Sequence, residues 1–303
     1  MNHSHDHSHN HRQGNYNRAF AIGILLNIVF VVVEFGYGLF SDSLALIADA
    51  GHNLSDVVSL LLAWGAARLA NISPTEKRTY GFRKVTIMAS LVSGILLLVA
   101  VGGITWESIG RFVRPAPVKG SIVIFVAAIG VVINTVTALL FIKGQKHDLN
   151  IRGAFLHMAA DAGVSVGVVV SGVLIMWTGW VLIDPVMSLL IVSVILIGTW
   201  GLLKESVNYA IDTVPKGIDL SEIKRYLLEK EQVDSLHDLH VWPLSTTEIA
   251  LTVHLVVHDN RVDNNFLSNL QRHLHDHFGI EHATIQIESM LGANKCMLYD
   301  GRD

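Results

Sequence analysis

The stretch ADAGHNLSDVVSLL, residues 48–61, places two aspartates and a histidine within an otherwise apolar segment. Ionisable side chains inside a membrane-spanning helix cost free energy, and they usually mark a functional site. On a helix, residues three or four positions apart lie on the same face. His52 and Asp56 therefore present one imidazole and one carboxylate from one side of the predicted helix. Asp49 lies on that face too, one turn earlier.

The composition around this segment is that of a membrane protein. Of the 303 residues, 51% are apolar and only 16% are charged, whereas soluble proteins average roughly 25% charged residues. Apolar runs of about 20 residues, the length needed to span hydrocarbon, recur through the first two-thirds of the chain. The six predicted spans cover residues 19–40, 44–67, 85–106, 121–142, 153–177 and 181–203.

The distribution of basic residues predicts that both termini are cytoplasmic, because cytoplasmic loops carry an excess of Lys and Arg. The outer loops of this topology hold Arg111, Arg114 and Lys119. The cytoplasmic segments hold many more, namely Arg12, Arg18, Arg68, Lys77, Arg78, Arg83, Lys84, Lys143, Lys146, Arg152 and Lys204. The polar start of the chain is unlike a signal peptide. We therefore expect a permanent first helix and, without an organelle-targeting signal, a bacterial inner-membrane protein.

The chain is predicted to have four parts. Residues 1–18 form a cytoplasmic tail with five histidines at alternate positions, a composition that binds metals without a fold. Residues 19–203 form the six-helix membrane domain, residues 204–290 a cytoplasmic domain, and residues 291–303 a C-terminal tail. Periodicity in the cytoplasmic domain predicts helices over 220–231 and 264–278 and strands over 235–242, 248–257 and 283–288. This αββαβ order is typical of a small α+β sandwich.

The fifth span repeats the pattern of the second. In GAFLHMAADAGVSVG, residues 153–167, His157 and Asp161 are again four positions apart. Two helices that each present an imidazole and a carboxylate can close a four-ligand tetrahedral cage, and this donor set suits zinc. Two carboxylates would balance the charge of the ion and lower the cost of holding it at low dielectric. The alternative is that each side chain only hydrogen-bonds a neighbouring helix.

Three motifs together resemble the cation diffusion facilitator family, in particular its bacterial zinc-efflux branch. They are SDSLALIADAGHNLSDVVSLL (41–61), FLHMAAD (155–161) and HDLHVW (237–242). The resemblance implies a six-helix transporter domain, a cytoplasmic ferredoxin-like domain and a homodimer. It also implies zinc export in exchange for protons. The family's transport site maps onto His52, Asp56, His157 and Asp161, the four residues reached from spacing.

The resemblance also places a metal site on the strands of the cytoplasmic domain, where His237, His254 and Glu288 match best. His240 and His282 are additional candidates. Gln286 stands where some relatives carry a stronger ligand. The alternative is that these are polar residues alternating outward from a half-exposed sheet. The helical histidines 273 and 277 are expected to lie on a solvated helix face.

The sequence therefore predicts an integral membrane zinc/proton antiporter and not an enzyme. Zinc is the expected substrate and a candidate regulatory ligand, and no organic cofactor is expected. The same ligands accept Cd²⁺, Co²⁺ or Ni²⁺. The expected partners are a second copy of the chain, the lipid bilayer and protons, with no nucleic acid. Two alternatives remain open, a membrane metal sensor and an intramembrane metallohydrolase.

Overall fold

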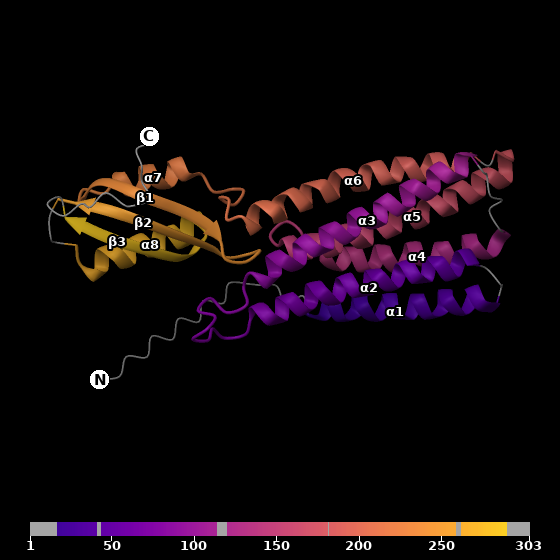
Figure 1. Ribbon diagram of the computed structural model, residues 1–303, viewed down its shortest axis with the longest axis horizontal. Helices are drawn as coiled ribbons and strands as arrows, with labels where there is room; N and C mark the ends of the chain where they lie inside the picture. The colour runs from indigo at the N-terminus through magenta and orange to yellow at the C-terminus, as the bar shows by residue number, and fades with distance from the viewer. Residues whose placement is uncertain (1–16, 41–43, 114–119, 181, 259–261, 290–303) are drawn as a thin grey trace. The chain divides into compact units, whose positions relative to one another are not determined.

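The computed structural model describes residues 17–40, 44–113, 120–180, 182–258 and 262–289, shown as ribbons in Figure 1. Within the six long helices, many side chains also lie outside this description, including those of residues 44–52. The chain divides into two compact units. One comprises Met1–Arg68 and Ala89–Leu203, and the other comprises Leu69–Met88 and Lys204–Asp303.

Six long helices account for the first unit, and three of them (α2, α3 and α6) continue into the second. They are α1 (Asn17–Phe40), α2 (Leu44–Ala70), α3 (Val85–Val113), α4 (Gly120–Phe141), α5 (Leu149–Thr178) and α6 (Ile183–Ala210). Each contains at least 22 residues, and about 20 are enough to cross the hydrocarbon. The six predicted helices are all present. The largest differences are at the ends of α3 and α6, which run seven residues beyond the predicted ends at 106 and 203, because a helix does not stop where its sequence becomes polar.

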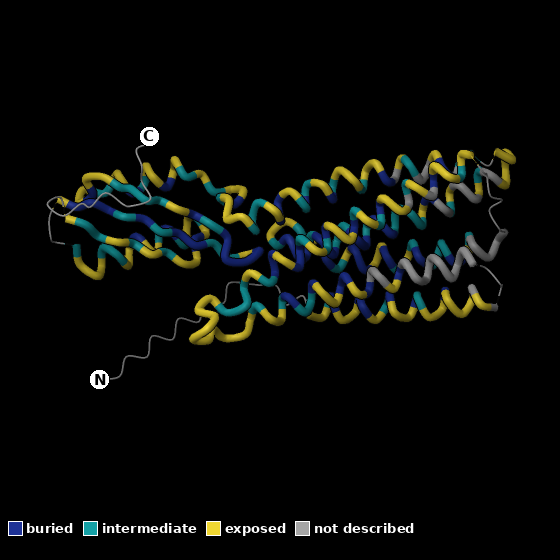
Figure 2. The backbone as a smooth tube through the Cα atoms, viewed as in Figure 1, coloured by how far each residue is buried: buried dark blue, intermediate teal, exposed yellow. Residues whose placement is uncertain are grey.

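Figure 2 shows the exposed and buried positions along the helices, and many of the exposed residues of this unit are large and apolar. Large apolar side chains point outward, including Val99 at 68% and Ile197 at 76% exposed, while Asn27 and Glu34 are buried at 1%. Such an apolar exterior requires lipid as its solvent. By length and apolarity, three of the described helical stretches qualify as membrane spans: Asn17–Tyr37, Val85–Val113 and Ile124–Phe141.

The helices α1 and α4 approach closely at a glycine. A Cβ atom added to Gly23 would lie 2.8 Å from the Thr137 methyl group, so any larger residue would push the two helices apart. The Thr137 hydroxyl donates to the Ile133 carbonyl of its own helix at 2.8 Å and is thereby satisfied inside the bundle. Small residues at helix contacts are typical of membrane domains, where close packing replaces the hydrophobic effect.

The second unit contains the predicted αββαβ order. Its elements are α7 (Leu220–Leu228), β1 (Val233–Pro243), β2 (Ile249–Val257), α8 (Asn264–Phe278) and β3 (Ile280–Ser289). The sheet order is β1-β2-β3, with β1 antiparallel and β3 parallel to β2. Aspartates 219 and 263 cap the two helix N-termini, as short oxygen-bearing side chains do. Gly279 ends α8 at φ 65°, a left-handed conformation that favours glycine.

The two faces of this sheet have different roles. Leu251, Val253 and Leu255 of β2 belong to a buried cluster that also contains Leu270 and Leu274 of α8. Side chains alternate between the two faces of a strand. The polar residues between these apolar ones must therefore lie on the opposite face, where the candidate metal site is found.

The segment between α2 and α3 belongs to this second unit through polar contacts. Lys84 pairs with Asp212 at 2.8 Å and Arg83 pairs with Glu248 at 3.3 Å. The Lys84–Asp212 pair is exposed, and such pairs contribute about 0–1 kcal/mol. The backbone N–H of Thr246 also donates to the Thr86 hydroxyl at 3.1 Å in a buried position, which fixes the start of α3 against the β1–β2 turn.

Stacked rings join α7 to α8. The ring of His273 lies between those of Tyr226 and His277, with centroids 3.9 Å away on each side, so it does not lie on a fully solvated face. The Lys230 ammonium lies 3.9 Å over the Tyr226 ring. Partial burial lowers the pKa of His273, and the charges of His277 and Lys230 lower it further, against the opposing effect of Asp276.

We expect this stack to weaken in acid. The pKa of His273 in the folded protein lies below its ordinary value of about 6.5. Neutral His273 therefore contributes fully to folding stability above about pH 6.5. That contribution is lost as pH falls through the pKa of the folded state, because the unfolded chain binds the proton more readily. Hydrogen exchange of the full-length protein, corrected for intrinsic rates, should show α8 losing protection between pH 7.5 and 5.5. His273→Phe should flatten this change, whereas His258→Phe, at the residue that follows β2, should leave it intact. An unaltered pH profile in His273→Phe would contradict the assignment.

Candidate metal-binding sites

The helical unit buries the predicted pair on α5. His157 is 5% exposed and Asp161 is 7% exposed, and they lie one turn apart on the same face of α5. The backbone of α2 is helical through His52 and Asp56, but the side chains of these two residues lie outside the described residues. The four-residue cage therefore stays a prediction. Two of its four residues, His157 and Asp161, are buried, as a metal site inside the bundle requires.

Two polar side chains of α1 hydrogen-bond to the residues that directly follow the two predicted histidine ligands in the chain. Asn53, which follows His52 in the chain, donates its amide to the Glu34 carboxylate at 2.6 Å. Asn27 donates to the sulfur of Met158, which follows His157, at 3.5 Å. Such bonds fix the rotation of α2 and α5 about their own axes, since each bond holds one face of a helix toward α1.

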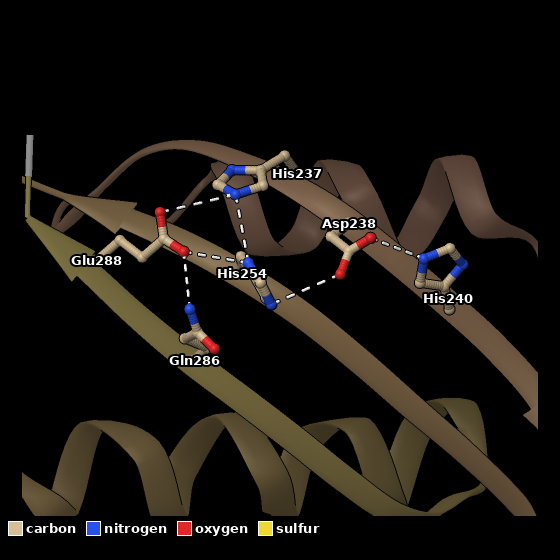
Figure 3. Close-up of polar contacts among 6 residues, drawn as sticks. All are labelled: His237, Asp238, His240, His254, Gln286 and Glu288. Carbon is tan, nitrogen blue, oxygen red and sulfur yellow. Dashed lines mark hydrogen bonds and ion pairs between the residues drawn. The ribbon is translucent and has the colours of Figure 1, made fainter. Parts of the chain in front are cut away.

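In the cytoplasmic unit, the strands bring the three predicted ligands together (Figure 3). His237 on β1 lies opposite His254 on β2, and Glu288 on β3 is two residues beyond the partner of His254. One ligand atom from each of the three side chains lies within 4.8 Å of the others. All three side chains are mostly buried, at 23%, 20% and 10% exposed respectively.

The spacing of these atoms fits a zinc ion. His254 Nδ1 lies 3.3 Å from His237 Nε2 and 3.1 Å from Glu288 Oε1, and His237 Nε2 lies 3.6 Å from Glu288 Oε2. Zinc bonds of about 2.0–2.1 Å at tetrahedral angles place neighbouring ligand atoms roughly 3.3 Å apart. Among the described residues, the buried Glu288 Oε2 has no hydrogen-bond partner. An ion here would satisfy that oxygen and leave a fourth position for another ligand.

The other candidates of this domain lie outside the three-residue cluster. His240 Nε2 is 2.8 Å from Asp238 Oδ1. His282 packs edge-on against the Tyr80 ring with centroids 5.7 Å apart. Gln286 donates its amide to Glu288 Oε1 at 2.8 Å, so in this structure it orients a candidate ligand.

Asp238 lies beside the cluster, and sequence periodicity did not place it there. Two-residue alternation assigns it to the face opposite His237. However, the pairing of β1 with β2 shifts by one residue between His237 and His240, and Asp238 adopts φ 53°. A bulge of this kind redirects a side chain, and Asp238 Oδ2 lies 3.5 Å from His254 Nε2. The adjacent letters HDLH are the only sequence signal.

The helical unit has an apolar surface and buried ionisable side chains, and the α+β unit groups three residues that could hold a metal ion. This combination is typical of an integral membrane protein that handles metal ions. Comparison with protein families agrees. Residues 20–209 match the cation efflux transmembrane domain, and residues 215–290 match the cation efflux protein cytoplasmic domain. The chain therefore belongs to the cation diffusion facilitator family, which confirms the resemblance seen in its motifs.

Its curated relatives are similar along nearly the whole chain. The zinc transporter ZitB of Escherichia coli is 37% identical over 289 residues, covering 94% of this chain and 91% of the relative. The metal cation efflux system protein CzcD of Cupriavidus metallidurans is 37% identical over 277 residues, covering 91% and 87%. A cadmium, cobalt and zinc/H⁺-K⁺ antiporter of Bacillus subtilis is 33% identical over 294 residues, covering 95% and 92%.

A solved structure is also similar. It is the metal-bound C-terminal domain of the CzcD transporter, 41% identical, with a TM-score of 0.22, covering 23% of this chain and 99% of that domain. Membership of the family confirms three expectations. The chain is a cation efflux transporter and not an enzyme, it has a helical transmembrane domain, and its α+β domain is cytoplasmic.

Proposed function

We propose that the protein exports Zn²⁺ from the cytoplasm in exchange for protons, by alternating access. The main support is the repeated His-x-x-x-Asp pattern. It consists of His52 with Asp56 on α2 and His157 with Asp161 on α5. The burial of the α5 pair supports it. The names of relatives support the cargo: one is a zinc transporter, and another is a cadmium, cobalt and zinc/H⁺-K⁺ antiporter.

Charge balance explains why two carboxylates belong to this site. A divalent ion held by two neutral imidazoles and two carboxylates forms a neutral unit, which costs less to hold at low dielectric than a bare charge. The emptied site would carry two negative charges. Protons returning on those ligands restore neutrality, so the empty carrier also crosses between its two states without a large electrostatic cost.

Competition between protons and metal gives the transport its direction. Zinc binds deprotonated ligands, and imidazole has an ordinary pKa near 6.5. On the more acidic outer side, protons displace zinc; on the cytoplasmic side, zinc displaces protons. Alternation between the two openings then moves zinc outward, because each opening has its own apparent affinity.

The remaining features support a bacterial inner-membrane homodimer with cytoplasmic termini. The excess of Lys and Arg in the predicted inner loops supports that orientation. The small core of the cytoplasmic domain supports pairing with a second copy, since small domains bury little apolar surface alone. We propose that the cytoplasmic cluster holds a regulatory Zn²⁺ on His237, His254 and Glu288. Cd²⁺, Co²⁺ and Ni²⁺ are further candidate substrates because the same donors bind them.

Proteoliposomes loaded with a zinc-sensitive dye test the function directly. In vesicles whose cytoplasmic domains face outward, zinc added outside should enter an acidic lumen rapidly and a pH-matched lumen slowly. A potassium gradient imposed without a pH gradient tests the second counter-ion named for the Bacillus relative. A metal sensor would bind zinc without flux. Zinc entry that is indifferent to lumenal pH would contradict proton exchange.

A further inference from the structure

The two ring nitrogens of His254 face different carboxylates, as the dashed lines in Figure 3 show. Nδ1 faces the candidate metal cluster, 3.1 Å from Glu288 Oε1 and 3.3 Å from His237 Nε2. Nε2 faces away from it, 3.5 Å from Asp238 Oδ2. Glu288 and Asp238 therefore lie on opposite sides of one imidazole.

A neutral imidazole carries one proton, on one of its two nitrogens, and only the other nitrogen can bind a metal. A carboxylate beside Nε2 favours the proton at Nε2, because the N–H can then donate to the carboxylate. That arrangement leaves the Nδ1 lone pair free at the cluster. Carboxylates behind metal-binding histidines commonly fix ring orientation and raise ligand basicity in this way.

The backbone is arranged to bring Asp238 to this position. Without the one-residue shift between His237 and His240, Asp238 would face the leucine-rich side of the sheet. Its left-handed φ of 53° costs free energy for a residue other than glycine, although Asp and Asn tolerate it best. Its second oxygen, Oδ1, lies 2.8 Å from His240 Nε2, which holds the carboxylate plane toward His254.

We infer that Asp238 is a positioning residue for zinc binding at the cytoplasmic cluster and acts through His254. The inference rests on the metal site proposed above. Asp238 is not itself a ligand. It keeps the proton of His254 on Nε2, so that Nδ1 is free to bind the metal. When His254 binds the ion, the 3.5 Å distance between Asp238 Oδ2 and His254 Nε2 shortens to that of a hydrogen bond. His240 supports that carboxylate from the solvent side.

The experiment measures the zinc dissociation constant of the full-length protein in detergent, by competition with chelators of graded affinity. The background variant carries Asp161→Asn and replaces the five tail histidines by Asn, so that zinc bound elsewhere does not interfere. Asp238→Asn keeps a side chain suited to the left-handed backbone, and we expect it to raise the dissociation constant about tenfold, within the range seen for such partners. Asp238→Gly, which removes the side chain without backbone strain, should raise it at least as much.

A double-mutant cycle and a matched control separate positioning from other effects. In a His254→Ala background, Asp238→Asn should cost no further affinity, because its route to the metal is gone. Asp234→Asn is the control, since Asp234 faces His258 Nε2 at 3.4 Å across the same strand pair; it should leave affinity unchanged. Three outcomes would each overturn the inference. Asp238→Asn could leave zinc affinity unchanged; it could still lower zinc affinity tenfold in the His254→Ala background; or Asp234→Asn could lower zinc affinity equally. If Glu288→Gln also leaves binding unchanged, the metal site itself is wrong.

Discussion

Asp161→Asn will reduce pH-driven zinc transport by at least about a hundredfold. The substitution keeps the size of the side chain and removes one of the two carboxylates proposed to neutralise the ion. A zinc site with a single carboxylate would hold a net positive charge inside the bilayer. Removing one partner of a buried charge pair typically costs about 3–5 kcal/mol. Asp161 is 7% exposed, and a neutral amide or a water molecule in place of its oxygen would not supply the lost negative charge. The measurement is the initial rate of dye response in proteoliposomes with an acidic lumen.

Asp276→Asn is the matched control for this prediction. Asp276 is a carboxylate of α8 that pairs with His275 at 2.8 Å, with a side chain 53% exposed, and its loss should leave the transport rate unchanged. The Asp161 variant should retain zinc binding at the cytoplasmic cluster, which shows that the chain still folds. Transport at the wild-type rate by Asp161→Asn would remove the membrane-site proposal while leaving the family assignment in place.

The order of elements was predictable because each depends on a local pattern. Apolar runs gave the six helices of the membrane domain, and alternation gave the strands. The ends were less predictable. β3 starts at Ile280, three residues before the predicted strand, directly after the left-handed Gly279, because backbone pairing with β2 extends it through residues without clear alternation. Conversely, α7 ends at Leu228, three residues before the predicted helix end.

The three clustered residues of the cytoplasmic domain came from two sources. Alternation placed His237, His254 and Glu288 one on each predicted strand, and the family resemblance proposed them as metal ligands; strand pairing brings them together. The carboxylate beside them was not predicted. Asp238 depends on a register shift, which is set by how β1 and β2 fit along their whole length. Local periodicity contains no information about that fit. The sequence therefore points to the atoms proposed to bind the metal, and the three-dimensional pairing points to the group that orients them.

Glu288→Gln will weaken zinc binding at the cytoplasmic cluster by at least about a hundredfold. Glu288 supplies the only carboxylate among the three clustered ligands, and a neutral amide oxygen is a far weaker partner for a divalent ion. The substitution also removes the buried anion that the two imidazoles face at 3.1 and 3.6 Å. Competition with graded chelators, in the background variant described above, gives the dissociation constant directly.

Glu231→Gln provides the control for this last change, since it removes a carboxylate next to the same domain's β1 without touching the cluster. Its zinc affinity should equal that of the background variant. The metal-free Glu288→Gln protein should be no less resistant to heat than its parent. Without an ion, a buried carboxylate whose Oε2 has no hydrogen-bond partner in the described part of the chain costs free energy, and a neutral amide costs less. If the three residues only stabilise the sheet, Glu288→Gln should give the opposite pair of results: unchanged zinc affinity and a lower melting temperature. Measuring both quantities on the same variant therefore distinguishes a metal site from a structural hydrogen-bond network.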